Sequence, residues 1–326
     1  MKKILGLGIL LFSMNLYANS FDLITLGSDG GVLDGNISGY LIKSANTDNF
    51  VSLDAGTILP GITKALKKGS FNEIKIPKDT EWSDTGYIFR EKIKGYLLTH
   101  SHLDHISGLV ISSTEDKKKG IYALDNTISN LKDTVFNWKL WPNFGNEGEG
   151  FKLNQYSYNR VSDVEFVEIP DTNLRVKAFP LSHSNHISTM FLVENDGDYM
   201  AYYGDVGPDK IEKTDLLEKT FKVLGPLIKK NKLKGIMIEV SYDNSREDNL
   251  LFGHLTPKWL NKELEVLEKY SGKNKLENLN IIVTHIKPSL KKDDNIREKI
   301  KKELIKNNKF KINYYFPQQG DLIKLN

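Results

Sequence analysis

Three histidines and an aspartate fall within six consecutive residues, in the run His100-Ser101-His102-Leu103-Asp104-His105. Packing gives no reason to gather three imidazoles and a carboxylate so closely, whereas a pair of divalent metal ions needs such a ligand set. If His100 and His102 lie at the end of a strand, they share a face and can bind one ion. Asp104 and His105, in the turn that enters a helix, point elsewhere and can bind a second ion. The run therefore predicts a two-metal site.

The other ligands of such a site must come from distant segments, and the chain has no cysteine, so they are His, Asp or Glu. His183 and His285 each follow a strand-like apolar run, and His254 is a further candidate. Asp205 ends another strand-like run and is the carboxylate best placed to bridge two ions. His186, three residues after His183, is more simply explained as a hydrogen-bonded structural histidine.

Composition places the chain among ordinary globular enzymes. Of its 326 residues, 39% are hydrophobic and 27% are charged, which is enough for one large α/β domain. There are 45 basic and 42 acidic residues, so the net charge of +3 argues against nucleic acid as a partner. Lysine-rich stretches at 117–119, 229–234 and 291–306 are read as solvated faces, because the last of them also contains acidic residues.

The first 18 residues resemble a secretory signal peptide. Lys2 and Lys3 precede the apolar stretch Ile4–Phe12, and Ala18 suits the position before a cleavage site. The apolar stretch is short for a membrane span, and no later segment approaches the roughly 18 apolar residues that a spanning helix needs. We therefore expect a signal peptide over residues 1–18 and a mature domain over 19–326, periplasmic or secreted and without a membrane contact after cleavage.

Strand-like and helix-like runs alternate along the chain with Gly and Asp turns between them. The sequence predicts strands at 21–26, 40–43, 50–53, 95–99, 164–169, 174–179, 190–193, 199–203, 235–240 and 281–284. It predicts helices at 106–112, 127–136, 214–231, 257–270 and 294–306. Because no internal repeat or linker rich in Pro, Gly or Ser divides the chain, we expect one layered α/β domain.

The run from Thr99 to Leu109, with the Ile-Ser-Gly-Leu tail after the last histidine, resembles the central motif of the class II cyclic nucleotide phosphodiesterases. This family is a branch of the metallo-β-lactamase superfamily. Further similar segments are found at 27–31, 36–41, 54–56, 121–124, 136–144, 238–244, 253–257 and 284–288. The histidine run alone indicates only the superfamily, whereas Trp141-Pro-Asn-Phe144 and Gly253-His-Leu-Thr-Pro257 indicate the family. Ser28 and Asp29 depart from its usual pattern.

The resemblance implies an α/β fold, a single-domain αββα four-layer sandwich of the metallo-β-lactamase type, with the metals at the edge between two sheets. It implies two divalent ions, with Zn²⁺ favoured and Mn²⁺ or Fe²⁺ tolerated. One ion would be held by His100, His102 and His183. The other would be held by Asp104, His105 and His285, and Asp205 would bridge the two.

The implied reaction is hydrolysis of a 3′,5′-cyclic nucleotide, cAMP or cGMP, to the 5′-monophosphate by a metal-bound hydroxide. Asp104 and Asp205 count as catalytic residues as well as ligands. His254 is expected to act as general acid or phosphate clamp, against the alternative of a structural histidine at a helix start. Thr256 before Pro257 is expected to cap that helix. Asp54 is a candidate to orient a ligand histidine.

Base recognition is expected in the segment after the first helix. Asn137 and Asn143 offer amide edges and Trp138 and Trp141 offer stacking surfaces for a purine, and His254 would also contact the substrate. The alternative is that the tryptophans of this segment belong to the core. The oligomeric state, monomer or homodimer, stays open.

Two other functions remain as alternatives at this point. Another exported hydrolase of the superfamily, a lactonase, a lactamase or a nuclease, could use the same metal ligands. A periplasmic binding protein that holds metal or nucleotide without turnover is the non-enzymatic alternative, and the complete ligand set argues against it.

Overall fold

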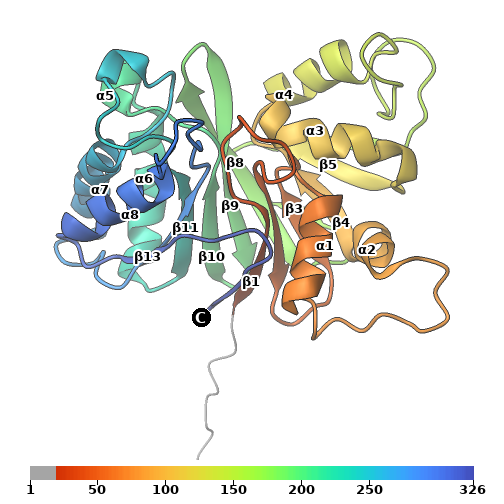
Figure 1. Cartoon of the computed structure of the whole chain (residues 1–326), viewed down its shortest axis with the longest axis horizontal. Coiled ribbons are helices and arrows are strands. Elements are labelled where there is room, and N and C mark those ends of the chain that lie inside the picture. The colour runs from red at the N-terminus through yellow and green to blue at the C-terminus, as the bar shows by residue number, and fades with distance from the viewer. Residues whose placement is uncertain (1–19) are drawn as a thin grey trace, which may run out of the picture.

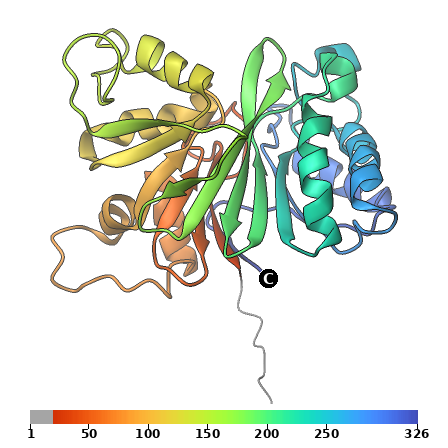
Figure 2. The same ribbon diagram turned by 180° about the vertical axis from the view of Figure 1, so that it is seen from behind.

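Two seven-stranded sheets pack face to face in the computed structural model, and helices cover the outer face of each sheet (Figure 1). The structure describes residues 20–326, so the signal peptide predicted for residues 1–18 lies outside the described residues. Seen from behind, the same four layers run across the molecule (Figure 2). The predicted single-domain αββα sandwich is confirmed.

The first sheet holds its strands in the order β14-β1-β2-β3-β4-β5-β6. Pairing is antiparallel from β14 to β3 and parallel from β3 to β6. The bounds are β1 (Phe21–Gly27), β2 (Gly39–Ser44), β3 (Phe50–Leu53), β4 (Ile93–Leu97), β5 (Lys119–Ala123), β6 (Tyr156–Arg160) and β14 (Leu322–Leu325).

The second sheet follows the order β13-β12-β11-β10-β9-β8-β7. Here β7 to β10 pair antiparallel, and β10 to β13 pair parallel. The bounds are β7 (Val167–Ile169), β8 (Leu174–His183), β9 (His186–Asn195), β10 (Asp198–Tyr203), β11 (Leu233–Glu239), β12 (Asn280–Thr284) and β13 (Asn313–Tyr315).

Helices α1 to α4 lie over the first sheet and α5 to α8 over the second (Figure 1). Their bounds are α1 (Leu59–Lys68), α2 (Asp84–Tyr87), α3 (Leu103–Ser112), α4 (Asp125–Asn130), α5 (Asp209–Glu212), α6 (Leu216–Lys229), α7 (Pro257–Ser271) and α8 (Ile296–Lys306). Short π turns (Ile88–Lys92, Leu131–Val135) and 3₁₀ turns (Ser113–Glu115, Asp248–Leu250) complete the set. Among the described residues, no helix combines the length and the apolar character that crossing a membrane requires.

Three apolar layers hold the sandwich together. The layer between the sheets includes Phe21 and Tyr40 from the first sheet and Met200 and Met237 from the second, all buried. A second layer joins the first sheet to its helices, and a third joins the other sheet to α6, α7 and α8. Because burial of apolar surface is the main stabilising contribution, each sheet depends on both of its neighbours.

Most predicted elements are present, with shifts that matter for the site. Strand β4 ends at Leu97, so His100 and His102 lie in the loop before α3 and not on a strand end. Strand β8 extends beyond the predicted range, so His183 is its last residue. Helix α1 escaped prediction because it begins with Leu-Pro-Gly, although proline is tolerated in a first helical turn.

Candidate dinuclear metal site

The predicted ligands gather at one edge of the sandwich, where strands of both sheets end. The first sheet supplies the loop between β4 and α3 and the first turn of α3, which together carry four of them. The second sheet supplies His183 at the end of β8, Asp205 two residues after β10, and His285 directly after β12. Ligand sites of open α/β sheets form at the carboxyl ends of strands, and this edge follows that rule.

One cluster consists of His100, His102, His183 and Asp205, whose donor atoms all lie within 4.8 Å of one another. Nε2 of His100 lies 3.0 Å from Nδ1 of His102. Oδ2 of Asp205 lies 3.8 Å from Nε2 of His100 and 3.6 Å from Nε2 of His183. Three imidazoles and one carboxylate oxygen thus converge on one small volume.

A second cluster consists of Asp104, His105, Asp205 and His285, again within 4.8 Å. Oδ1 of Asp205 lies 3.3 Å from Nε2 of His105 and 3.2 Å from Nε2 of His285. Oδ2 of Asp104 lies 3.1 Å from Nε2 of His285. Asp205 therefore directs one oxygen to each cluster, as a bridging carboxylate must.

The donor atoms fit a pair of divalent cations. Nε2 of His105 is buried and has no hydrogen-bond partner among the described residues, so its lone pair faces the second cluster unsatisfied. Burial lowers the pKa values of His100, His183 and His285, which keeps these imidazoles in the neutral form that binds metals. Imidazole and carboxylate donors in this mixture suit Zn²⁺.

The second ring nitrogen of several ligand histidines is held by the protein. Nδ1 of His105 lies 2.8 Å from Oδ2 of Asp54, a fully buried carboxylate that also accepts hydrogen bonds from the Thr99 amide (2.8 Å) and the Tyr202 hydroxyl (2.6 Å). Nδ1 of His183 lies 2.8 Å from the carbonyl oxygen of Gly253. Such partners select the tautomer and orient the ring. The role expected for Asp54 agrees with this geometry.

Two glycines allow the backbone to approach the ligands. A Cβ on Gly253 would lie 2.5 Å from the amide nitrogen of Ser184, and the φ of Gly253 is +76°. A Cβ on Gly30 would lie 2.4 Å from Nδ1 of His285. Asp54 and His285 themselves have φ values of +51° and +54°. Backbone strain of this kind collects at functional sites, where the surrounding structure must enforce it.

His254 lies inside the site but does not belong to either of the two four-residue clusters. Its side chain is 5% exposed, and its ring centroid lies 4.8 Å from that of His183 and 5.3 Å from that of His285. Nδ1 lies 2.7 Å from Oε1 of Glu239. Burial lowers the pKa of His254 to about 4. Thr256 caps α7 through the amide of Trp259, as predicted, so the helix start and the site share one segment.

Glu239 ends β11, is fully buried, and was not predicted from the sequence as a site residue. Its carboxylate accepts hydrogen bonds from the amides of Val206 (3.1 Å) and Ser241 (3.0 Å) and from the Ser241 hydroxyl (2.6 Å). A charged residue at the end of the apolar run Gly235–Val240 was the available signal, because buried carboxylates are rare without partners.

Lys287 was also missed, although it follows the ligand His285 by two residues. Its Nζ donates to the carbonyl oxygen of Gly30 at 3.3 Å, and among residues 20–326 no carboxylate oxygen lies within 4.0 Å of it. A Cβ on Gly31 would lie 3.3 Å from Oδ2 of Asp104 and 3.7 Å from Nζ of Lys287. A cation thus stands at the rim of the second cluster.

His186 remains outside both clusters, as its weaker claim predicted. It is exposed at the start of β9, with its ring centroid 4.6 Å from that of His102. The ring therefore stands at the mouth of the site rather than among the ligands.

The base-recognition residues predicted after the first helix are corrected by the structure. Asn143 is 0% exposed, its amide nitrogen donates to the carbonyls of Glu147 and Glu149, and its oxygen accepts from the Gly145 amide. It has no group left for a substrate. The core alternative for the tryptophans holds for Trp141, which packs on the apolar layer under α3 and donates its indole N–H to Ser113.

Asn137 is likewise occupied within its own turn. Its side-chain oxygen accepts from the amides of Lys139 and Leu140, and its nitrogen donates to the carbonyl oxygen of Asp133. Its amide edge therefore stabilises a local turn, as Asn side chains commonly do, and is not presented to a ligand.

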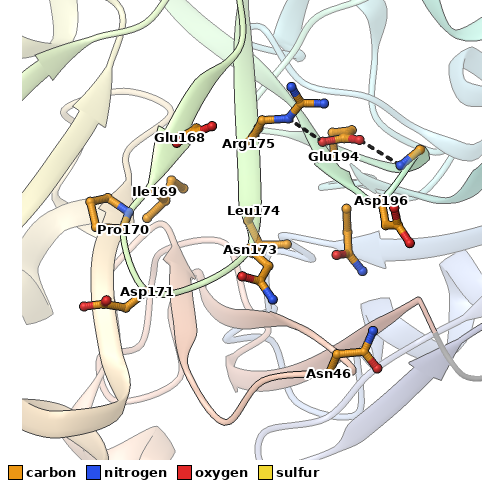
Figure 3. A pocket seen from close by; sticks show the side chains of 12 residues that line it. Asn46, Glu168, Ile169, Pro170, Asp171, Asn173, Leu174, Arg175, Glu194 and Asp196 are labelled. Atoms are coloured by element: carbon orange, nitrogen blue, oxygen red, sulfur yellow. Dashed lines mark hydrogen bonds and ion pairs between the residues drawn. The ribbon is translucent and has the colours of Figure 1, made fainter.

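A separate surface cavity of about 720 Å³ lies at the far end of β8 and β9 (Figure 3). Its lining includes Leu174, the first residue of β8, whereas the candidate ligand His183 is the last. At about 3.3 Å per residue, ten residues of strand separate the two by roughly 30 Å. The Arg175 and Glu194 side chains form an ion pair across its wall (Figure 3). The cavity is therefore distinct from the metal site.

Solved structures of known proteins share this architecture. The crystal structure of unliganded yeast PDE1 matches with a TM-score of 0.79 and 25% identity, covering 94% of this chain and 100% of that one. The metallo-β-lactamase fold protein YhfI from Bacillus subtilis matches with a TM-score of 0.59 and 14% identity over 93% of this chain and 99% of its own. Fold and site together define a protein of the metallo-β-lactamase fold.

Sequence comparison narrows this class to a family. The model of the class-II cAMP phosphodiesterases matches residues 20–320, so the chain belongs to that family. A 3′,5′-cyclic-nucleotide phosphodiesterase of Aliivibrio fischeri is 46% identical over 314 residues, which cover 96% of this chain and 95% of that protein. The resemblance stated from the motifs is confirmed over nearly all of the described chain.

Proposed function

We propose that this protein hydrolyses 3′,5′-cyclic nucleotides, cAMP, cGMP or both, to 5′-monophosphates at a two-metal site. The observation that carries the proposal is the position of Asp205, which belongs to both clusters. Its Oδ2 faces His183 in the first cluster and its Oδ1 faces His285 in the second. The family and the name of the Aliivibrio relative support the choice of a cyclic nucleotide as substrate.

His100, His102 and His183 would hold one divalent cation, Asp104, His105 and His285 would hold the other, and Asp205 would bridge them. Zn²⁺ is the favoured metal, and Mn²⁺ or Fe²⁺ would tolerate the same ligands. When bound, such a pair of ions activates a water and neutralises charge on phosphoryl oxygens.

The protein supplies the proton for the leaving oxygen through His254. The Glu239 carboxylate accepts from Nδ1 of this imidazole at 2.7 Å, so Nε2 carries a proton only in the imidazolium form, which the negative charge of a bound phosphodiester would favour against the effect of burial. Among the described residues, Nε2 of His254 has no hydrogen-bond partner. It is also not among the fully buried side-chain atoms that lack a partner. Donation from Nε2 to the departing 3′-oxygen of the ribose is the general-acid step of the proposal.

Lys287 contributes a positive charge beside the phosphodiester anion. Its ammonium is half-buried and lacks a carboxylate partner within 4.0 Å among residues 20–326. A charge-assisted hydrogen bond to a phosphoryl oxygen would orient the anion in the site.

Product analysis on a panel of 3′,5′- and 2′,3′-cyclic nucleotides, with metal content measured on the same sample, tests this function. We expect 5′-monophosphates from cAMP or cGMP and about two metal ions per chain. His102→Ala and Asp205→Ala should abolish turnover and lower metal content, whereas His186→Ala, an exposed histidine at the same mouth, should retain both. A protein that opens a β-lactam or lactone but leaves cyclic nucleotides intact would contradict the proposal.

Export to the periplasm or medium after removal of residues 1–18 is a separate part of the proposal, supported by the basic and apolar pattern of that segment. Scavenging of external nucleotide would then be its role. Cell fractionation tests it: full-length protein that stays in the cytosol would contradict export without affecting the proposed chemistry. Sedimentation of the mature chain would decide between monomer and homodimer.

A further inference from the structure

The segment between β11 and α7 carries more than His254. Tyr242, Arg246 and Phe252 form a continuous stack beside that histidine. The Tyr242 ring centroid lies 5.7 Å from that of His254, edge to face. The Arg246 guanidinium carbon lies 4.5 Å from the centroid of the Tyr242 ring and 5.5 Å from that of Phe252. The stack therefore leads from the proposed general acid to the surface.

Arg246 is not committed to an ion pair. Its Nε donates to the carbonyl oxygen of Leu250 at 2.7 Å, which fixes the plane of the guanidinium. In the described part of the chain, its two terminal nitrogens have no hydrogen-bond partner, and no carboxylate oxygen lies within 4.0 Å of the group. A half-buried guanidinium held between two rings, with free donors, is built to bind an acceptor.

Phe252 is exposed and conformationally strained. Its side chain is 58% exposed, and its φ is +52°, in the left-handed region that a bulky residue avoids. Gly253, at +76°, continues this turn and places its carbonyl against His183. Burial does not explain an aromatic ring at this position, and strain that packing does not require points to a functional role.

The proposed reaction decides on which side of the site the nucleoside lies. Water adds to phosphorus as the bond from phosphorus to the ribose 3′-oxygen breaks, and that oxygen takes up one proton, so one water is consumed. The leaving oxygen belongs to the ribose, and its proton comes from His254. The ribose and base must therefore lie on the His254 side of the phosphorus, where the stack is.

We infer that Tyr242, Arg246 and Phe252 form the nucleoside-binding wall of the site, with Phe252 as the stacking face for the base and Arg246 as hydrogen-bond donor to its edge. This inference rests on the proposed function and replaces the expected role of Asn137, Trp141 and Asn143. Arginine donates two hydrogen bonds to O6 and N7 of guanine, whereas adenine offers only N7 on that edge. Arg246 therefore favours guanine, and Phe252 serves both purines.

Steady-state kinetics on cAMP and cGMP with Phe252→Ala and Arg246→Met test the wall. Loss of a stacking ring should raise KM for both substrates about tenfold with kcat little changed. Arg246→Met should raise KM for cGMP at least fivefold more than for cAMP. Phe151→Ala removes a ring that is 73% exposed on another loop and should leave KM unchanged.

Product inhibition separates binding of the base from integrity of the metal site. In Phe252→Ala the inhibition constants of 5′-AMP and 5′-GMP should rise with KM, while that of inorganic phosphate and the metal content stay at wild-type values. Phe252→Leu keeps an apolar side chain without a ring and repeats the test if the alanine variant is poorly folded. Unchanged KM values in both Phe252 variants would contradict the inference that these residues bind the nucleoside. A wild-type protein inactive on every cyclic nucleotide would instead overturn the proposed function.

Discussion

Oε1 of Glu239 lies 2.7 Å from Nδ1 of His254, and the carboxylate itself is held by the amides of Val206 and Ser241. The pair is buried at the end of β11, so the imidazole has one orientation available. A histidine near metal ions can act as a ligand or as an acid. The contact of His254 with Glu239, outside the two four-residue clusters, favours the acid role for His254.

Replacing His254 tests the acid role. We expect His254→Ala to lower kcat for cyclic nucleotides about 100- to 10,000-fold with unchanged metal content. Glu239→Gln should lower it less, because the ring remains but loses the charge that orients it. On bis(4-nitrophenyl) phosphate, whose leaving group needs no proton, both variants should lose little activity. Equal losses on both substrates would show that His254 does not act as the acid.

Asp54 should control metal affinity rather than the chemical step. Its contact with Nδ1 of His105 orients a ligand, and loss of such a partner commonly lowers metal affinity 10- to 100-fold. We expect Asp54→Ala to lose metal at lower chelator concentration than wild type and to regain activity in excess metal. The exposed Asp163→Ala serves as control, and a variant with wild-type chelator resistance would contradict this role.

Lys287→Met should weaken productive binding of the phosphodiester. The removed contact is a charge-assisted hydrogen bond, worth about 1.5–3 kcal/mol, so kcat/KM should fall about 10- to 150-fold. Lys291→Met removes the same charge from an exposed position four residues away and should change kcat/KM less than twofold. If both variants lowered kcat/KM equally and added salt removed both losses, Lys287 would act only through long-range electrostatic attraction and not through a direct hydrogen bond.

Glu263 should make the stability of the fold depend on pH. It is buried on α7, and burial, together with the negative charges of Asp209 and Glu218, raises its pKa to about 7. Tyr203, the last residue of β10, is a further titratable group beside it.

A raised carboxyl pKa means that the folded state binds the proton more tightly than the unfolded state between pH 4.5 and 7. The contribution of Glu263 to the free energy of unfolding is therefore greatest at the acidic end of this window and is lost as pH rises through 7. Glu263→Gln mimics the protonated form, so its advantage over wild type should grow from near zero at pH 4.5 to about 3 kcal/mol at pH 8. Urea unfolding at both pH values measures this, with the exposed Glu265→Gln as control. An advantage that does not change with pH would exclude the titration of Glu263 as its cause.

The sequence predicted which histidines and aspartates gather at the site, because the spacing of the central run is local and chemically unusual. The residue types and spacing of the run from His100 to His105 were enough to mark it as a candidate site. Asp205 and His285 were predicted because site residues commonly follow the ends of strands. It could not find Glu239 or Lys287, because a lone charge beside a strand has no periodicity to mark it.

The error on the base-recognition residues has a similar physical origin. Asn143 and Trp141 have side chains capable of binding a purine, but hydrogen bonds to Glu147, Glu149 and Ser113 already occupy them. Arg246 and Phe252 lack any pattern in the sequence, since their meeting depends on a left-handed turn. Local sequence reports which groups a residue offers, and only the fold reports which groups remain free.

The division of the ligands between the two sheets has a consequence for the whole molecule. Four of the seven candidate ligands come from the loop after β4 and the first turn of α3, beside the first sheet, and three come from the ends of β8, β10 and β12 in the second. Two bound ions would thus cross-link the halves of the sandwich at one edge, and their binding free energy would add to the resistance of the fold to unfolding. Chelation would then do more than stop turnover: it would allow the two halves to separate at that edge.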